Sequence, residues 1–310
     1  MKKLLPLLLL TLVVAVSGCV GQPTTPAGIT CAGSGMTNGI SITDFSFDFA
    51  EIYGGEAVGL TFTAENLGGT SGTLLGAEVF GPTINEGGVA TDLAWGCPAP
   101  CDLTLTIDQV LDAPNVDLSI PGGMYTNVWT FEAPTGLGAE AGYDFNVRTT
   151  YSYVTNFVGV LTVMSSSYLR TLPEEERKTL IQAGGLSQQC HSGGPLALEA
   201  AAGTHFVDPT PGDTKTIRFK VTNVGGGYPY YPTPLDPVTT MYKVHINPTS
   251  GEVTCPDQTI TLSKGQTGTF SCTFSPSSAV TNKRDITFTI SMDYNYWTDR
   301  STFIKVLRPL

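Results

Sequence analysis

The stretch LTFTAENLGG, residues 60–69, recurs without a gap as IRFKVTNVGG at residues 217–226. In both copies apolar side chains alternate with polar ones up to an asparagine, and two glycines follow shortly after. Alternation with period two is typical of a strand that buries one face, and the Asn and Gly residues are typical of a turn. The chain therefore contains a duplicated strand-and-turn unit.

The duplication extends toward the C-terminal part of each copy. Seven residues of copy one match seven of copy two at a constant offset of 143: Leu118, Gly122, Phe131, Phe145, Tyr151, Tyr153 and Val163 against Thr261, Gly265, Phe274, Phe288, Tyr294, Tyr296 and Val306. The earlier motif is offset by 157, so copy one carries an insertion, which falls between Gly81 and Cys101. Alternating runs between Gly, Pro and Asn clusters predict an all-β chain of two tandem antiparallel β-sandwiches.

The copies define the expected domain boundaries. We expect the first β-sandwich at residues 40–166, a linker at 167–194 and the second β-sandwich at 195–310. Within the linker, Thr171-Leu172-Pro173-Glu174 fits a capping box, and Gly184-Gly185 is a stop signal. The sequence thus predicts a short linker helix that joins the two sandwiches.

The N-terminus has the pattern of an export signal. Lys2 and Lys3 precede an apolar run, and residues 1–18 together predict a signal peptide that is too short to span a bilayer. Val16-Ser17-Gly18-Cys19 resembles the bacterial and archaeal lipobox, and that resemblance implies lipidation of Cys19. Residues 19–39 hold no charge, which predicts a flexible tether of roughly 25 Å. The expected location is the extracytoplasmic face of the cell membrane, with the membrane as a partner through the lipid on Cys19.

The charge balance excludes one class of partner. The chain carries 27 acidic against 16 basic residues, for a net charge of −11, and only 14% of its residues are charged. Such a chain is repelled by nucleic acid. No nucleic-acid partner is expected.

The cysteine count favours disulfides. Without Cys19, six cysteines remain, an even number in an exported chain. Cys255 with Cys272 is the preferred pair, because Cys272 falls in a strand of copy two and Cys255 in the strand or loop that leads toward its neighbour. Cys97 and Cys101 are candidates to close a small loop in the insertion, which leaves Cys31 with Cys190.

No motif for catalysis or metal binding is present. The three histidines, His191, His205 and His245, lie in unrelated contexts, and no zinc, nucleotide or hydrolase motif occurs. We therefore expect no catalytic residue, no metal, no cofactor and no enzymatic activity.

The most suggestive surface segment is YPYYPTP at residues 228–234. Tyr228, Tyr230 and Tyr231, stiffened by prolines, are candidates for ligand contact, because rigid aromatic side chains give contact area at low entropic cost. The alternative is a proline-stiffened loop that packs on its own sandwich.

The repeated motif Phe-x-Ala/Val-x-Asn-x-Gly-Gly, at Phe62–Gly69 and Phe219–Gly226, resembles the immunoglobulin-like, CARDB-type modules of prokaryotic surface proteins. The resemblance implies tandem immunoglobulin-like sandwiches and a structural or adhesive role in the cell envelope, through contacts with another envelope protein. A second hypothesis is a lipoprotein that binds a glycan or small ligand through Tyr228–Tyr231. A third is a subunit that assembles by strand exchange.

Overall fold

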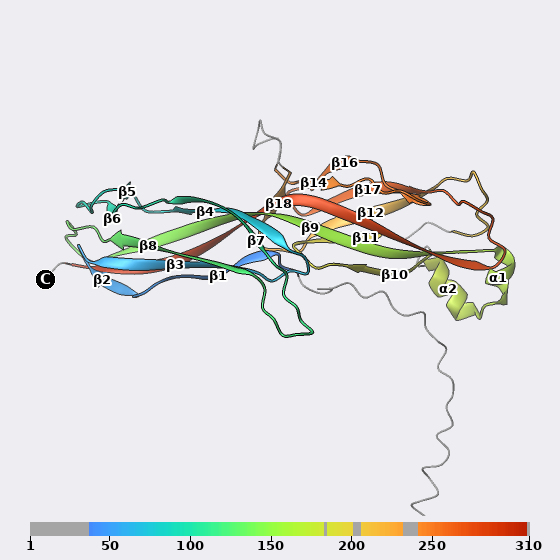
Figure 1. Cartoon of the computed structure of the whole chain (residues 1–310), viewed down its shortest axis with the longest axis horizontal. Helices are drawn as coiled ribbons and strands as arrows, with labels where there is room; N and C mark the ends of the chain where they lie inside the picture. Colours follow the sequence, from blue (N-terminus) through green and yellow to red (C-terminus); the bar gives the residue numbers. More distant parts are fainter. Residues whose placement is uncertain (1–36, 183–184, 201–205, 232–240, 309–310) are drawn as a thin grey trace, which may run out of the picture.

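The computed structural model describes residues 37–182, 185–200, 206–231 and 241–308, and it confirms the all-β sandwich fold (Figure 1). Three sheets make up the structure. The first has the order β1-β3-β8-β6-β5: β1 is Ile40–Phe47, β3 Ala57–Asn66, β8 Met124–Glu132, β6 Trp95–Cys97 and β5 Ile84–Glu86. The sheet confined to copy two has the order β11-β12-β17-β15: Leu196–Ala200, Lys215–Asn223, Thr267–Phe274 and Val253–Thr254.

The third sheet is shared by both sandwiches. Its main path is β16-β14-β18-β9-β4-β7: Gln258–Thr261, Lys243–Ile246, Lys283–Leu307, Ala141–Met164, Gly72–Phe80 and Thr104–Leu111. Three shorter strands join it at the sides: β10 (Leu186–His191) pairs with β9, while β13 (Tyr228–Tyr230) and β2 (Glu51–Tyr53) pair with β18. The pairing is antiparallel apart from the short parallel pairs β2–β18 and β5–β6.

Two long strands, β9 and β18, run through both sandwiches (Figure 1). Every residue of the 24-residue strand β9 is paired with β18. The first half of β9 pairs with β4 in the first sandwich, and its second half pairs with β10 in the second. At about 3.4 Å per residue the ladder is roughly 80 Å long. The sequence boundary between the copies is therefore not a spatial boundary, because each copy gives half of its last strand to the other sandwich.

The duplication appears in space as a pseudo-twofold axis. Ser152 and Asn295 correspond to each other in the two copies, and they are also direct partners in the β9–β18 ladder. The neighbouring strands follow the same symmetry, because β4 pairs Thr73 with Ser152 in copy one and β13 pairs Tyr230 with Asn295 in copy two. The two halves of the chain are thus arranged like the subunits of a dimer.

Four tyrosines surround this axis on the inner side of the shared sheet. Tyr151, Tyr153, Tyr294 and Tyr296 are buried, with the rings of Tyr151 and Tyr296 5.6 Å apart and those of Tyr153 and Tyr294 6.2 Å apart. Burial raises the pKa of all four phenols. All four tyrosines belong to the hydrophobic core.

The asparagine of the repeated motif makes equivalent hydrogen bonds in the two copies, so the motif has the same structural role in each. The amide nitrogen of Asn66 donates to the carbonyls of Thr70 and Leu111, while its oxygen accepts from the Gly68 amide. Asn223 makes the corresponding bonds in copy two, to Gly227, Gly265 and Gly225. One buried side chain thereby bonds the turn that follows β3 or β12 to a distant segment, at Leu111 in copy one and at Gly265 in copy two.

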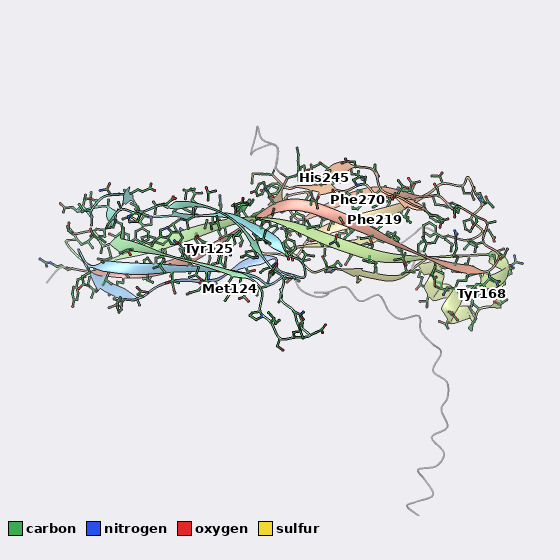
Figure 2. The ribbon with its side chains drawn as sticks, viewed as in Figure 1. Met124, Tyr125, Tyr168, Phe219, His245 and Phe270 are labelled. Carbon is green, nitrogen blue, oxygen red and sulfur yellow. A yellow bond between two sulfur atoms is a disulfide. The ribbon has the colours of Figure 1, made fainter. Side chains whose placement is uncertain are left out.

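The cores of the two sandwiches are rich in aromatic residues. In the first, the ring of Phe47 lies 5.0 Å from that of Phe145 on the shared sheet. In the second, Phe219 lies 5.8 Å from Phe157 and 5.2 Å from Phe270 (Figure 2). The shared sheet supplies one wall of both cores.

The helices lie elsewhere than expected. The helices α1 (Ser166–Thr171) and α2 (Glu174–Gln182) connect the copies along the chain, but in space they lie at one end of the long axis, not between the sandwiches (Figure 1). Thr171, predicted as the cap of the helix, is the last residue of α1, and its hydroxyl donates to the carbonyl of Tyr168. Neither helix contains a buried residue. The β9–β18 ladder, and not a helix, holds the sandwiches together.

Candidate functional site

The predicted tyrosine segment forms a strand where we expected a loop. Tyr228–Tyr230 is β13, which pairs with the middle of β18 so that Tyr228 faces Trp297 and Tyr230 faces Asn295. Residues 232–234 lie outside the described part of the chain. The contact of these tyrosines with a ligand stays a prediction.

Each tyrosine has a partner within its own sandwich. The ring of Tyr228 lies 4.9 Å from Trp297 and 5.6 Å from Tyr242. Burial raises the pKa of Tyr230, whose hydroxyl is hydrogen-bonded to Asn295. Tyr231 stacks on His245 at 4.9 Å. All three tyrosines are half-buried, so local packing and a partly open aromatic face are both present.

A row of side chains continues from Tyr228 across the outer face of the shared sheet. The guanidinium carbon of Arg148 lies 4.1 Å from the centre of the Trp297 ring and 5.7 Å from that of Phe80. We call Tyr242, Tyr228, Trp297, Arg148 and Phe80 the aromatic row. It crosses β13, β18, β9 and β4 and joins residues of both copies close to the pseudo-twofold axis.

An ion pair holds Arg148 in the row. Its Nε and Nη2 atoms donate to the two carboxylate oxygens of Asp299, each at a distance of 2.9 Å. The hydrogen bond with Asp299 raises the pKa of Arg148. Both side chains stay more than a third exposed. The row therefore combines aromatic faces with a charged pair that still reaches solvent.

Sequence reasoning missed most of this row. Trp297 points to the outer face of the shared sheet and is half-buried. Arg148 and Phe80 lie far from the tyrosine segment along the chain. The alternation in β9 places Arg148 on the outer face, but only the register, in which Arg148 opposes Asp299, brings it beside Trp297.

His245 belongs to a neighbouring polar group on the same face of the second sandwich (Figure 2). Its Nε2 atom lies 3.5 Å from a carboxylate oxygen of Asp257, and its Nδ1 atom has no hydrogen-bond partner among the described residues. His191 lies on β10, where burial lowers its pKa, and His205 is outside the described residues. His191 and His245 lie on different strands, β10 and β14 (Lys243–Ile246).

Two grooves lie near these elements. A groove of about 210 Å³ at the pseudo-twofold axis is lined by the start of β1, the rings of Tyr151 and Tyr296, and Arg300. A groove of about 750 Å³ lies beside the insertion of copy one, between the Cys97–Cys101 loop and Val128 of β8.

Two of the predicted disulfides are formed. Cys97 pairs with Cys101, and Cys255 pairs with Cys272 between β17 and the segment after β15. Cys190 is disulfide-bonded and lies within β10, opposite Val158. Its predicted partner Cys31 lies outside the described residues, as does the predicted lipidation site Cys19.

The described part of the chain holds neither a group of side chains arranged for a metal ion nor a helix that could span a membrane. Among those residues, no group of three or more His, Cys, Asp or Glu side chains is arranged to hold a metal ion. No helix there has the length and apolar character needed to cross a bilayer.

Comparisons with known proteins provide little information about the function of this chain. No protein-family model matches the chain, and no curated protein matches it. Among solved structures, the crystal structure of collagen adhesin (CNA) from S. aureus is similar at 10% sequence identity, over 91% of this chain and 95% of that one, with a TM-score of 0.11. This similarity to an adhesin is too faint to carry an argument about function.

Proposed function

We propose that this chain is a lipid-anchored, extracytoplasmic structural or adhesive protein of a cell envelope, acting through protein–protein contacts and not as an enzyme. The observation that carries the proposal is the β9–β18 ladder, which makes the two sandwiches one continuous body. Two sandwiches joined only by a linker would hinge, whereas two that share a 24-residue strand resist bending between them.

The surface chemistry supports a location outside the cytoplasm. Two disulfides lie within the described residues, and disulfides persist in oxidising compartments. The low share of charged residues and the lipobox-like segment at Cys19 agree with an exported, anchored protein. The proposed immunoglobulin-like, CARDB-type kinship fits the same setting.

The point where the chain enters the fold supports a scaffold role in which both ends of the long axis are free to contact partners. Gly39 is buried beside Tyr151 and Pro195, so the tether meets the fold close to the pseudo-twofold axis. The helices lie at one end of the long axis and the C-terminus at the other (Figure 1). An anchor attached at the middle leaves both ends free for contacts.

The test is chemical cross-linking in native membranes, followed by purification and mass spectrometry of the chain and its partners. We expect a lipid-modified Cys19 peptide and a stoichiometric envelope protein cross-linked to this chain. Cys19→Ser is the matched variant, and it should move the protein out of the membrane fraction. An unmodified Cys19, or a protein that purifies alone, would contradict the proposal.

A second candidate function is glycan binding at the aromatic row. The observation in its favour is the charged pair Arg148–Asp299 beside the half-buried rings of Trp297 and Tyr228. Aromatic faces stack on sugar rings, and a charged pair can donate to and accept from hydroxyl groups.

Glycan binding is tested by retention on immobilised polysaccharides. Trp297→Ala and Tyr228→Ala should lose retention, whereas Phe303→Ala should keep it, since Phe303 is an exposed aromatic residue on the same strand but outside the row. Equal retention by all three variants would rule out the row as the binding site.

A further inference from the structure

A loop of copy one exposes several apolar side chains. The segment of residues 112–123, between β7 and β8, protrudes from the middle of the molecule (Figure 1). Val116 and Leu118 are each 67% exposed and Ile120 is 52% exposed. We call residues 112–123 the apolar loop. Met124, at its base (Figure 2), is exposed as well, and so is Val110.

The loop is held in shape by its own hydrogen bonds. Asn115 and Ile120 form two backbone hydrogen bonds with each other, each 2.9 Å long. The side-chain oxygen of Asn115 also accepts a hydrogen bond from the Leu118 amide. Ser119 adopts a left-handed conformation that turns the chain at the tip. The three apolar side chains are therefore presented on a defined tip.

The base of the loop adjoins the point where the chain enters the fold. The amide of Asn66 donates to the carbonyl of Gly123, and the amide of the next residue, Leu67, donates to the carbonyl of Gly39. The turn after β3 thus contacts both the apolar loop and the N-terminal segment. His245, on the outer face of the shared sheet, lies on the other side of the molecule in this view (Figure 2).

We propose that the apolar loop inserts into the lipid surface to which the tether attaches, and so fixes the orientation of the elongated molecule on the membrane. The inference rests on the proposed membrane attachment. A tether of about 20 residues reaches roughly 25 Å, so a loop next to the entry point lies within range of the same surface. Inserted there, the loop leaves the outer face of the shared sheet directed toward the exterior.

The size of the apolar tip favours lipid over a protein partner. Three aliphatic side chains bury about 300 Å² at most, whereas a specific protein interface buries about 800 Å² on each partner. Lipid needs no matching surface, so a small tip suffices. Asp112 and Asp117 are exposed beside the apolar residues. The loop is therefore suited to a neutral lipid surface and not to an anionic one.

The test places a fluorescent reporter on the tip. The chain, with a hexahistidine sequence in place of residues 1–18 and with Cys19→Ser, is held on vesicles of brominated phosphatidylcholine by a nickel-chelating lipid. Leu118→Trp puts an indole on the tip, and Leu93→Trp is the matched control, because Leu93 is 84% exposed in another loop. The parent chain supplies the fluorescence of the three native tryptophans.

We expect the indole introduced by Leu118→Trp to shift to shorter wavelength and to be quenched by the brominated chains. The indole introduced by Leu93→Trp should stay at the emission of water-exposed tryptophan. Adding anionic phosphatidylglycerol should reduce the quenching. If the Leu118→Trp signal matches that of the control, the proposal is overturned. Because the vesicle attachment is artificial, this outcome is independent of whether Cys19 is lipidated in the cell.

Discussion

The hydroxyl of Tyr296 donates a hydrogen bond of 2.8 Å to the side-chain oxygen of Asn223, and both residues are buried. The same hydroxyl accepts from the Gly227 amide. In copy one, the hydroxyl of Tyr153 accepts from the Thr70 amide at the equivalent position. The shared strands are thus bonded to the repeated turns of both sandwiches, so the turn motif and the ladder form one hydrogen-bonded unit.

Removing a motif asparagine should destabilise the whole chain. Asn223→Ala leaves two carbonyls, a backbone amide and the Tyr296 hydroxyl without this partner, and we expect a loss of about 2–4 kcal/mol in the free energy of unfolding. Asn66→Ala should cost a similar amount. Asn85→Ala is the control, since Asn85 is exposed and donates only to the Val89 carbonyl, and it should cost under about 1 kcal/mol. Urea unfolding measures all three; equal losses would contradict the role of the motif.

The buried tyrosines predict a loss of stability at high pH. Burial raises the pKa of Tyr296 to about 12 from the ordinary value of 10.0. The folded state then holds the phenol proton more tightly than the unfolded state, so this stabilisation is complete below pH 10 and is lost as the pH rises toward 12. Thermal unfolding followed across pH 9–12 should show the fall, and Tyr296→Phe should show a smaller one. An unchanged slope in the variant would argue against this cause.

The shared ladder predicts that the chain survives a cut between the copies. A protease site inserted after Gln182, in a helix without buried residues, separates copy one from copy two along the chain. We expect the two fragments to elute together from a sizing column under reducing, native conditions, because β9 and β18 remain paired. They should separate only in denaturant. Separation in native buffer would contradict the shared sheet.

The two resolved disulfides should differ in their effect on stability. The pair Cys255–Cys272 spans 17 residues and Cys97–Cys101 spans 4. In the loop-entropy model the first contributes about 3 kcal/mol and the second about 2 kcal/mol. Cys255→Ala with Cys272→Ala should therefore lower the unfolding temperature more than Cys97→Ala with Cys101→Ala. The opposite order would show that loop length does not govern their contributions.

Much of the fold follows from patterns in the sequence. Period-two alternation predicts the strands around Phe62 and Phe219, and the offset between the copies predicts two similar sandwiches. The sharing of β9 and β18 did not follow, because alternation gives the faces of a strand but not its partner. One trace of it is present in the sequence: the alternation around Tyr151 continues from Tyr143 to Phe157, a run far longer than the usual five or six residues of a strand.

The candidate site was harder to predict. Tyr228, Tyr230 and Tyr231 stand together in the chain, so composition alone draws attention to them. Arg148 reaches Trp297 only through a register that pairs residues about 150 positions apart. The apolar loop was not singled out either, because Val116, Leu118 and Ile120 alternate as strand residues do, and their exposure depends on the tip that they form.

The pseudo-twofold axis through Ser152 and Asn295 also bears on the history of the chain. A half-length ancestor whose last strand paired with its own copy would have been a strand-exchanged homodimer, in which every substitution appears twice. Fusing the two genes end to end removes that constraint, because each half then mutates alone. Copy one could acquire the disulfide-closed insertion and the apolar loop, and copy two the tyrosine strand, while the common scaffold was preserved. A symmetric ancestor thereby becomes a molecule with two different ends and two different faces.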